Sequence, residues 1–142
     1  MKTISPREAS IFACLTDTVV APGGTLPPVS HTDAAFFFDD WLGRAPKINA
    51  IGLRVFVTGL ELAPLAMGYG HRLRRLDEQQ RASFLQTVEK SPLAPVRQIV
   101  KLVKGLAFLC YYGDDGMMKK LGYDADANVA RGRELRAREG RP

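Results

Sequence analysis

Cysteine and histidine, the residues that most often bind metals or act as nucleophiles and bases, occur only twice each in this chain. Cys14 and Cys110 lie far apart in apolar surroundings and without Cys-x-x-Cys spacing, so the sequence predicts neither a disulfide framework nor a thiolate metal site. His31 and His71 form no His-x-x-x-His or Glu-x-x-His pair. We therefore expect two buried free thiols, no metal site and no cofactor held by this chain.

The chain has no internal repeat, no low-complexity segment and no run in which apolar and polar residues alternate between hairpin turns. Hydrophobic residues make up 46% of the sequence and charged residues 25%, which is the ordinary balance of a folded globular protein. A length of 142 residues fits one domain with one core. Because no strand pattern is present, we expect an all-α fold, a compact single-domain bundle of five to six helices.

The first residues do not have the features of an export signal. No twin arginine and no long apolar run precedes the polar residues Ser5 and Glu8. As given, the chain is therefore expected in the cytoplasm, and a periplasmic location together with a partner would need an export signal further upstream.

Helix starts are marked by capping residues. Ser5 and Glu8, with Pro6 between them, form a capping box that predicts a helix to about Val20. Glycines and prolines then predict a loop over 21–28. Further helices are expected after Thr32 or Asp33, after Asp77, and after Ser91-Pro92.

Residues 47–70 are apolar on almost every side and are interrupted by Arg54, Glu61 and Pro64. Such a segment forms either a buried central helix or a membrane span. Each of the two charged residues costs about 2.5–3.5 kcal/mol near a bilayer centre, so we expect a buried core helix and no membrane span. The two charges lie two helical turns apart, on one side, where they can meet water or a partner.

The helix predicted over 92–112 has one apolar face and one basic face, and the basic face carries Arg97, Lys101 and Lys104. Beyond Lys104 the polar face disappears, so the end at Leu106–Tyr112 needs cover from the domain or from a partner. Residues 128–142 hold five arginines and few large apolar groups, which predicts an extended or weakly helical tail. We divide the chain into a helical domain over 1–127 and an arginine-rich tail over 128–142.

The formal net charge of +5 is unevenly distributed. Residues 1–70 hold five basic and six acidic residues, whereas residues 71–142 hold fifteen and nine. Clustered Lys and Arg are typical of nucleic-acid binding, which gives one alternative function, a basic helical nucleic-acid-binding module. A solvated helix face or an acidic protein partner explains the same charge.

Residue types of a hydrolase occur in Ser30-His31-Thr32-Asp33, and Cys110 is a possible nucleophile, which gives a second alternative, a small helical hydrolase. Catalytic triads are assembled from separate elements, so four consecutive loop residues are weak support. Both cysteines lie on apolar helix faces, where core packing is the expected role. We expect no catalytic residues in this chain.

Several ordered motifs resemble the gluconate 2-dehydrogenase subunit 3 family, the small accessory subunits of GMC-type FAD oxidoreductases. The resemblance covers about residues 5–135, and residues 91–124 are its most specific part. The motifs are Ser5-Pro-Arg-Glu-Ala, Thr32-Asp33 before an aromatic helix, Ser91-Pro-Leu-Ala-Pro-Val-Arg97, Tyr111-Tyr-Gly-Asp114, Leu121-Gly-Tyr-Asp124 and Asn128-Val-Ala-Arg-Gly-Arg133.

This resemblance implies a subunit with no redox centre of its own, not itself an enzyme, which binds a large flavoprotein subunit and supports its folding, stability or assembly. FAD is then expected in the partner, and a cytochrome subunit is a further possible member of the complex. The family commonly begins with a twin-arginine signal, and the sequence given departs from the family there.

The residues expected at a partner interface are aromatic and arginine side chains, because these types supply most interface hot spots. Four aromatic residues, Phe36, Phe38, Trp41 and Phe108, are expected mainly in the core, although Phe108 is also a candidate for the interface. The full set of interface candidates is Phe108, Tyr111, Tyr112, Tyr123, Arg131, Arg133 and Arg136.

Overall fold

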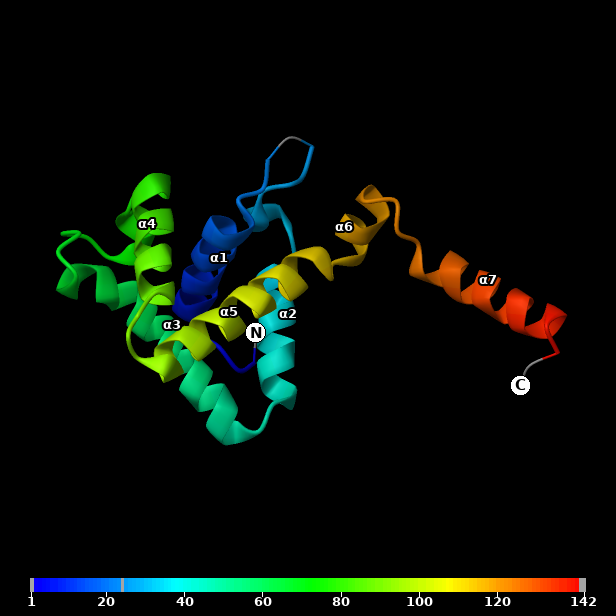
Figure 1. Ribbon diagram of the computed structural model, residues 1–142, viewed down its shortest axis with the longest axis horizontal. Helices are drawn as coiled ribbons and strands as arrows, with labels where there is room; N and C mark the ends of the chain where they lie inside the picture. Colours follow the sequence, from blue (N-terminus) through cyan, green and yellow to red (C-terminus); the bar gives the residue numbers. More distant parts are fainter. Residues whose placement is uncertain (1, 24, 141–142) are drawn as a thin grey trace.

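The computed structural model describes residues 2–23 and 25–140, and these residues form seven α-helices and two short 3-10 helices without any strand (Figure 1). The predicted all-α fold class is therefore confirmed. The elements are α1 (Pro6–Val20), η1 (Val29–His31), α2 (Ala34–Arg44), α3 (Lys47–Ala66), η2 (Leu73–Arg75), α4 (Glu78–Glu89), α5 (Ala94–Tyr112), α6 (Asp115–Lys120) and α7 (Ala125–Arg138).

The N-terminal helix α1 lies at the centre of the bundle and packs against α2, α3, α4 and α5 (Figure 1). Its start is the predicted capping box, in which the Glu8 amide donates to Ser5 Oγ and the Ser5 amide donates to the Glu8 carboxylate. Its buried face includes Phe12, which stacks on Phe38 of α2 with the ring centroids 3.8 Å apart. Aromatic stacking thus joins the first two helices in the core.

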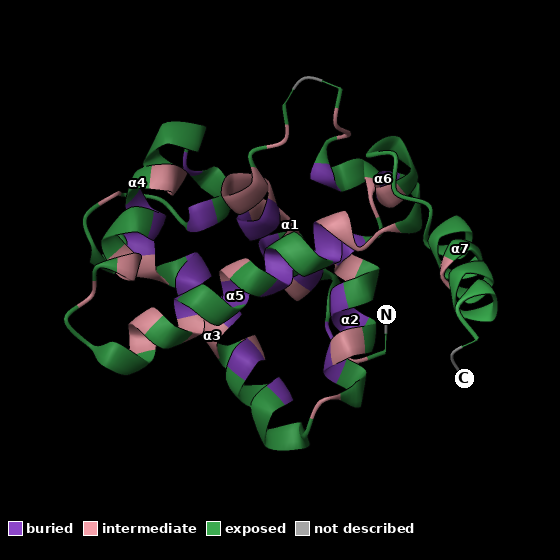
Figure 2. Ribbon diagram, turned by 45° about the vertical axis from the view of Figure 1, so that its right-hand side comes forward, coloured by how far each residue is buried: buried purple, intermediate pink, exposed green. Residues whose placement is uncertain are grey.

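Most of the described part of the tail belongs to a regular helix, α7, which already begins at Ala125 and projects from the body of the molecule (Figure 1). Asp124 caps this helix by accepting a hydrogen bond from the Ala127 amide at 3.0 Å, and Ala, Arg, Leu and Glu favour helical structure. No residue of α7 is buried, and Figure 2 shows the helix exposed almost throughout. Together with the short α6, it brings the number of α-helices above the predicted five to six.

The N-terminal segment is held against α2 by one buried carboxylate. Asp39 accepts hydrogen bonds from the amides of Lys2, Thr3 and Ile4 at 2.7–2.8 Å. Burial by itself would raise the pKa of Asp39, but the three amides outweigh burial and lower the pKa below its usual value of 3.8. The ionised carboxylate is therefore the form that fits this site.

We expect Asp39→Ala to lower the free energy of unfolding by about 2 kcal/mol, because three backbone amides lose a charged acceptor. Urea unfolding at neutral pH measures the loss. The control is Asp40→Ala, since Asp40 is an exposed neighbour whose ion pair with Arg44 lies in solvent and contributes little. Equal stability of the two variants would contradict the role assigned to Asp39.

Candidate partner-binding surface

An exposed apolar surface lies on the outer face of α3. Ile48, Ile51 and Val55 are 79%, 59% and 66% exposed, and their spacing of three and four residues places them on one side of the helix. The opposite side packs into the core through Leu53, Val57 and Leu60, among others. The expectation of a helix buried on all sides is therefore wrong for the outer face, because α3 lies at the edge of the bundle.

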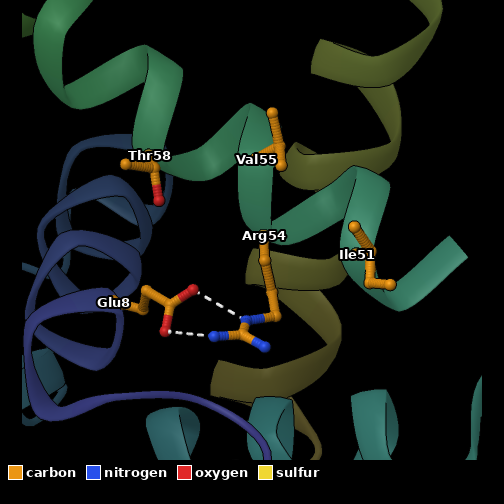
Figure 3. Close-up of a pocket in the computed structure, with 5 residues that line it drawn as sticks. All are labelled: Glu8, Ile51, Arg54, Val55 and Thr58. Atoms are coloured by element: carbon orange, nitrogen blue, oxygen red, sulfur yellow. Dashed lines mark hydrogen bonds and ion pairs between the residues drawn. The ribbon is translucent and has the colours of Figure 1, made fainter. Parts of the chain in front are cut away.

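A surface hollow of about 260 Å³ lies beside this stripe (Figure 3). Its wall is formed by Ile51, Val55 and Thr58 of α3, and an ion pair between Arg54 and Glu8 crosses it. Arg54 Nε donates to Glu8 Oε1 at 2.7 Å and Arg54 Nη2 donates to Oε2 at 3.0 Å, which is the bidentate arrangement that arginine forms with a carboxylate. The hollow thus combines apolar walls with a fixed, paired charge.

Glu8 connects the start of α1 to α3. Its carboxylate caps α1 through Ser5 and also accepts both hydrogen bonds from Arg54. The Arg54 hydrogen bond is the main reason that the pKa of Glu8 is lowered from 4.5 to about 2; burial opposes the shift, and the Ser5 hydrogen bonds add to it. Both the capping of α1 and the pairing with Arg54 thus depend on the negative charge of Glu8.

We expect this pair to contribute about 1 kcal/mol to stability, less than the pKa shift alone implies, because the Arg54 side chain is 38% exposed and screened by water. Because the pKa is lower in the folded state, the contribution is complete above pH 4.5 and is lost as the pH falls towards about 2. Unfolding of the parent and Glu8→Gln chains between these pH values measures it. A difference between the two chains that does not change with pH would contradict the assignment.

A second hollow continues the surface towards the turn between α2 and α3. It also measures about 260 Å³ and shares Ile51 and Arg54 with the first. Its remaining wall comes from Thr3 of the N-terminal segment, from the end of α2 and from the start of α3, where Gly43 and Lys47 lie. The outer face of α3 therefore has apolar residues at its centre and polar residues at its edge, which is the usual composition of a protein interface.

Glu61, two helical turns beyond Arg54 on α3, is buried. Glu61 is 1% exposed, and its carboxylate accepts hydrogen bonds from Arg74 Nε at 3.0 Å and from the Arg74 amide at 3.3 Å. The sequence predicts that Arg54 and Glu61 can meet water or a partner; this is wrong for the buried Glu61, whereas the Arg54 side chain is 38% exposed. The structure instead pairs each of them with a residue distant in the sequence, Glu8 and Arg74.

The predicted interface residues separate into three groups. Tyr111 is fully buried and donates a hydrogen bond to the Pro27 carbonyl at 2.6 Å, and burial raises its pKa, so this candidate is a core residue and its placement at an interface is wrong. Phe108 is 42% exposed and stacks on the half-buried Tyr112. The remaining candidates, Tyr123, Arg131, Arg133 and Arg136, are exposed on or next to α7.

Of the four aromatic residues expected in the core, only two are there. Phe38 is buried, and Trp41 is partly buried against the core. Phe36 is 58% exposed and Phe108 is also exposed, so the expectation is wrong for these two. The reason is that α2 and α5 each direct one side to the core and the other to solvent.

The candidate catalytic residues are not joined in the described part of the chain. Ser30 and His31 are exposed in η1, whereas Cys110 is buried, as expected. Burial raises the pKa of the Cys110 thiol to about 12, and it also raises the pKa of the half-buried Cys14, although Arg81 opposes that effect. No side-chain hydrogen bond of Ser30, His31 or Cys110 to another described residue is present.

Among residues 2–23 and 25–140, no group of three His, Cys, Asp or Glu side chains is placed to hold a metal ion. One helix of this described part of the chain, α3, is long and apolar enough to cross a membrane by length and composition alone. About a third of the residues in its most apolar stretch are buried inside the protein. Core helices of other proteins meet the same criteria.

No protein-family model, no curated protein and no solved structure matches this chain.

Proposed function

We propose that this chain is a non-catalytic accessory subunit that binds a large GMC-type FAD-dependent oxidoreductase subunit and supports its folding, stability or assembly. The observation that carries the proposal is the outer face of α3, where Ile48, Ile51 and Val55 stand more than half exposed on one side of one helix. The choice of a flavoprotein as the partner rests on the sequence motifs at residues 5–135 that resemble the small subunits of such enzymes.

The α3 face has the chemistry of a contact between proteins. Full burial of an Ile or Val side chain is worth roughly 1.5–3 kcal/mol, so covering these three residues supplies several kcal/mol towards binding. The Arg54–Glu8 pair beside them is already neutralised within the chain, and it can be covered without leaving an unpaired charge. An apolar patch with satisfied polar groups at its edge suits a lasting subunit contact.

The arm formed by α7 supports the same function. It projects from the body, has no buried residue, and exposes Arg131, Arg133 and Arg136 (Figures 1 and 2). Arginine is enriched at interfaces because its planar, multivalent group donates several hydrogen bonds in a fixed geometry. In the proposed complex, α3 provides the main contact and α7 reaches along the larger subunit.

Co-expression tests this function. The tagged chain is expressed with a candidate GMC-type flavoprotein subunit, and the purified material is examined for flavin absorbance and subunit ratio. We expect a yellow complex with equimolar subunits, and a lower soluble yield of the flavoprotein when the small chain is omitted. A colourless small chain, together with an unchanged yield of the flavoprotein, would reject the proposal.

A further inference from the structure

The segment between α3 and α4 carries a group of basic residues that the proposed function does not use. His71, Arg72, Arg74 and Arg75 follow one another closely in the sequence, and Arg74 alone of these side chains is used inside the fold, where it pairs with the buried Glu61. Within the described part of the chain, the side chains of the other three make no hydrogen bond or ion pair. Three cationic or hydrogen-bonding groups therefore remain available.

Local structure directs these groups to one place. The Arg75 amide donates to the Arg72 carbonyl at 2.8 Å, which closes the 3-10 turn η2 and sets the two arginines at its two ends. Leu73 and Leu76 are buried and anchor this turn to the core. Because the turn is anchored by two leucines and by the Arg74–Glu61 pair, the arginines extend from a fixed backbone.

The two arginines and His71 line a hollow of about 270 Å³, and Leu65 and Gly70 complete its wall. Among the described residues that form this wall, none is a carboxylate. The hollow is thus lined by positive and hydrogen-bond-donating groups with no acidic residue to neutralise them. The hollow at α3 differs in this respect, because Arg54 there already forms an ion pair with Glu8.

The backbone adds further donors. Gly70 has a φ of +78°, a conformation that favours glycine, and it turns the chain from the end of α3 into η2. The amides of Gly70, His71 and Arg72 donate no hydrogen bond to any other described residue. Successive free amides next to guanidinium groups form the donor set that proteins use to bind oxyanions.

We propose that this hollow, formed by His71, Arg72 and Arg75, is a binding site for a phosphate group. A tetrahedral oxyanion presents several acceptor oxygens, and two guanidinium groups on one rigid turn match it by paired hydrogen bonds as well as by charge. The phosphate belongs either to a small soluble phosphoester or to the headgroup of an acidic lipid. Exposed Leu65 at the edge of the hollow is compatible with both sources.

Titration of the full chain with inorganic phosphate, at constant ionic strength and followed by amide NMR, tests the site. We expect saturable shifts at Gly70, His71, Arg72 and Arg75. The variant Arg72→Gln/Arg75→Gln is expected to weaken binding at least about tenfold, because it removes two charge-assisted contacts. A control with the same charge change, Lys101→Gln/Lys119→Gln on α5 and α6, is expected to bind as the parent does.

Vesicles separate the two sources of phosphate. Binding to vesicles that contain phosphatidic acid, but not to pure phosphatidylcholine, together with loss of binding in the Arg72→Gln/Arg75→Gln chain, identifies a lipid headgroup. Binding of inorganic phosphate alone identifies a soluble ligand. The proposal is overturned if neither probe binds saturably, or if the control variant weakens binding as much as the arginine variant. Circular dichroism of both variants establishes that they remain folded.

Discussion

Replacing Ile51 and Val55 with aspartate is expected to weaken binding of the flavoprotein subunit at least about 100-fold while leaving the helical bundle folded. In the proposed complex these side chains are covered, so the variant would bury two carboxylates without partners, and the cost of burying an unpaired charge is several kcal/mol. In the free chain both side chains are more than half exposed, so their replacement removes little core packing. Titration of the purified large subunit with each chain measures the dissociation constant.

The matched control is Leu93→Asp/Leu102→Asp. Leu93, the N-cap residue of α5, is 62% exposed, and Leu102 in the middle of α5 is 50% exposed. Replacing them with aspartate adds the same charge at a distance from the proposed contact. This variant is expected to bind within about twofold of the parent chain. If both variants bind equally well, α3 is not the contact surface; if both fail to bind, the effect comes from charge rather than from position.

The substitution Arg74→Ala is expected to lower the free energy of unfolding by about 3 kcal/mol, the largest stability effect of any change proposed for this chain. Glu61 is 1% exposed and accepts hydrogen bonds from Arg74 Nε and from the Arg74 backbone amide. The alanine variant keeps the amide donor, but the loss of the guanidinium leaves the buried carboxylate without its cation. Removing one member of a buried pair costs more than the pair contributes, because the remaining charge stays desolvated. Chemical unfolding at neutral pH measures the change.

Two further variants identify the cause of this loss. Arg75→Ala, at the adjacent exposed arginine, is expected to change stability by less than about 0.5 kcal/mol. The double variant Glu61→Leu/Arg74→Met replaces the pair with apolar side chains and is expected to recover most of the stability lost in Arg74→Ala. A double variant as unstable as Arg74→Ala would mean that the loss comes from packing of the arginine stem and not from the unpaired Glu61 carboxylate.

Features that depend on neighbouring residues were predictable from the sequence. The capping box predicted at Ser5–Glu8 is formed, and the helix predicted after Asp77 starts there with a second capping box that Gln80 completes. Each box involves contacts over only three residues. The apolar face of the helix after Ser91-Pro92 was also found, since Val100, Val103, Leu106 and Cys110 recur at helical spacing and are all buried. Contacts between neighbouring residues and one clear helical spacing of apolar residues were sufficient to predict these features.

The candidate site was not predictable in the same way. Along α3 the side chains are apolar on both faces, so the pattern does not distinguish the buried Leu53 and Val57 from the exposed Ile51 and Val55. Only the position of α3 at the edge of the bundle decides between them, and that position depends on packing between distant segments. The Arg54–Glu8 pair also depends on packing between distant segments, because it joins residues 46 positions apart.

Tyr111 is one of the aromatic residues whose burial the sequence did not predict correctly. Tyr111 and Tyr112 are adjacent and both lie in an apolar stretch, yet only Tyr111 is fully buried, with its hydroxyl bonded to the Pro27 carbonyl. That contact spans 84 positions and depends on the path of the loop before η1. Phe108, by contrast, remains exposed and stays a candidate for contact with a partner.

Sedimentation velocity of the purified flavoprotein subunit, recorded at the flavin absorbance with and without the small chain, tests the proposed subunit role most directly. The flavin boundary is expected to move faster when the parent chain is added, to stop changing at one small chain per flavoprotein, and to be unaffected by the Ile51→Asp/Val55→Asp chain. A flavin boundary that the parent chain does not shift would contradict the assignment of this protein as a subunit of that enzyme.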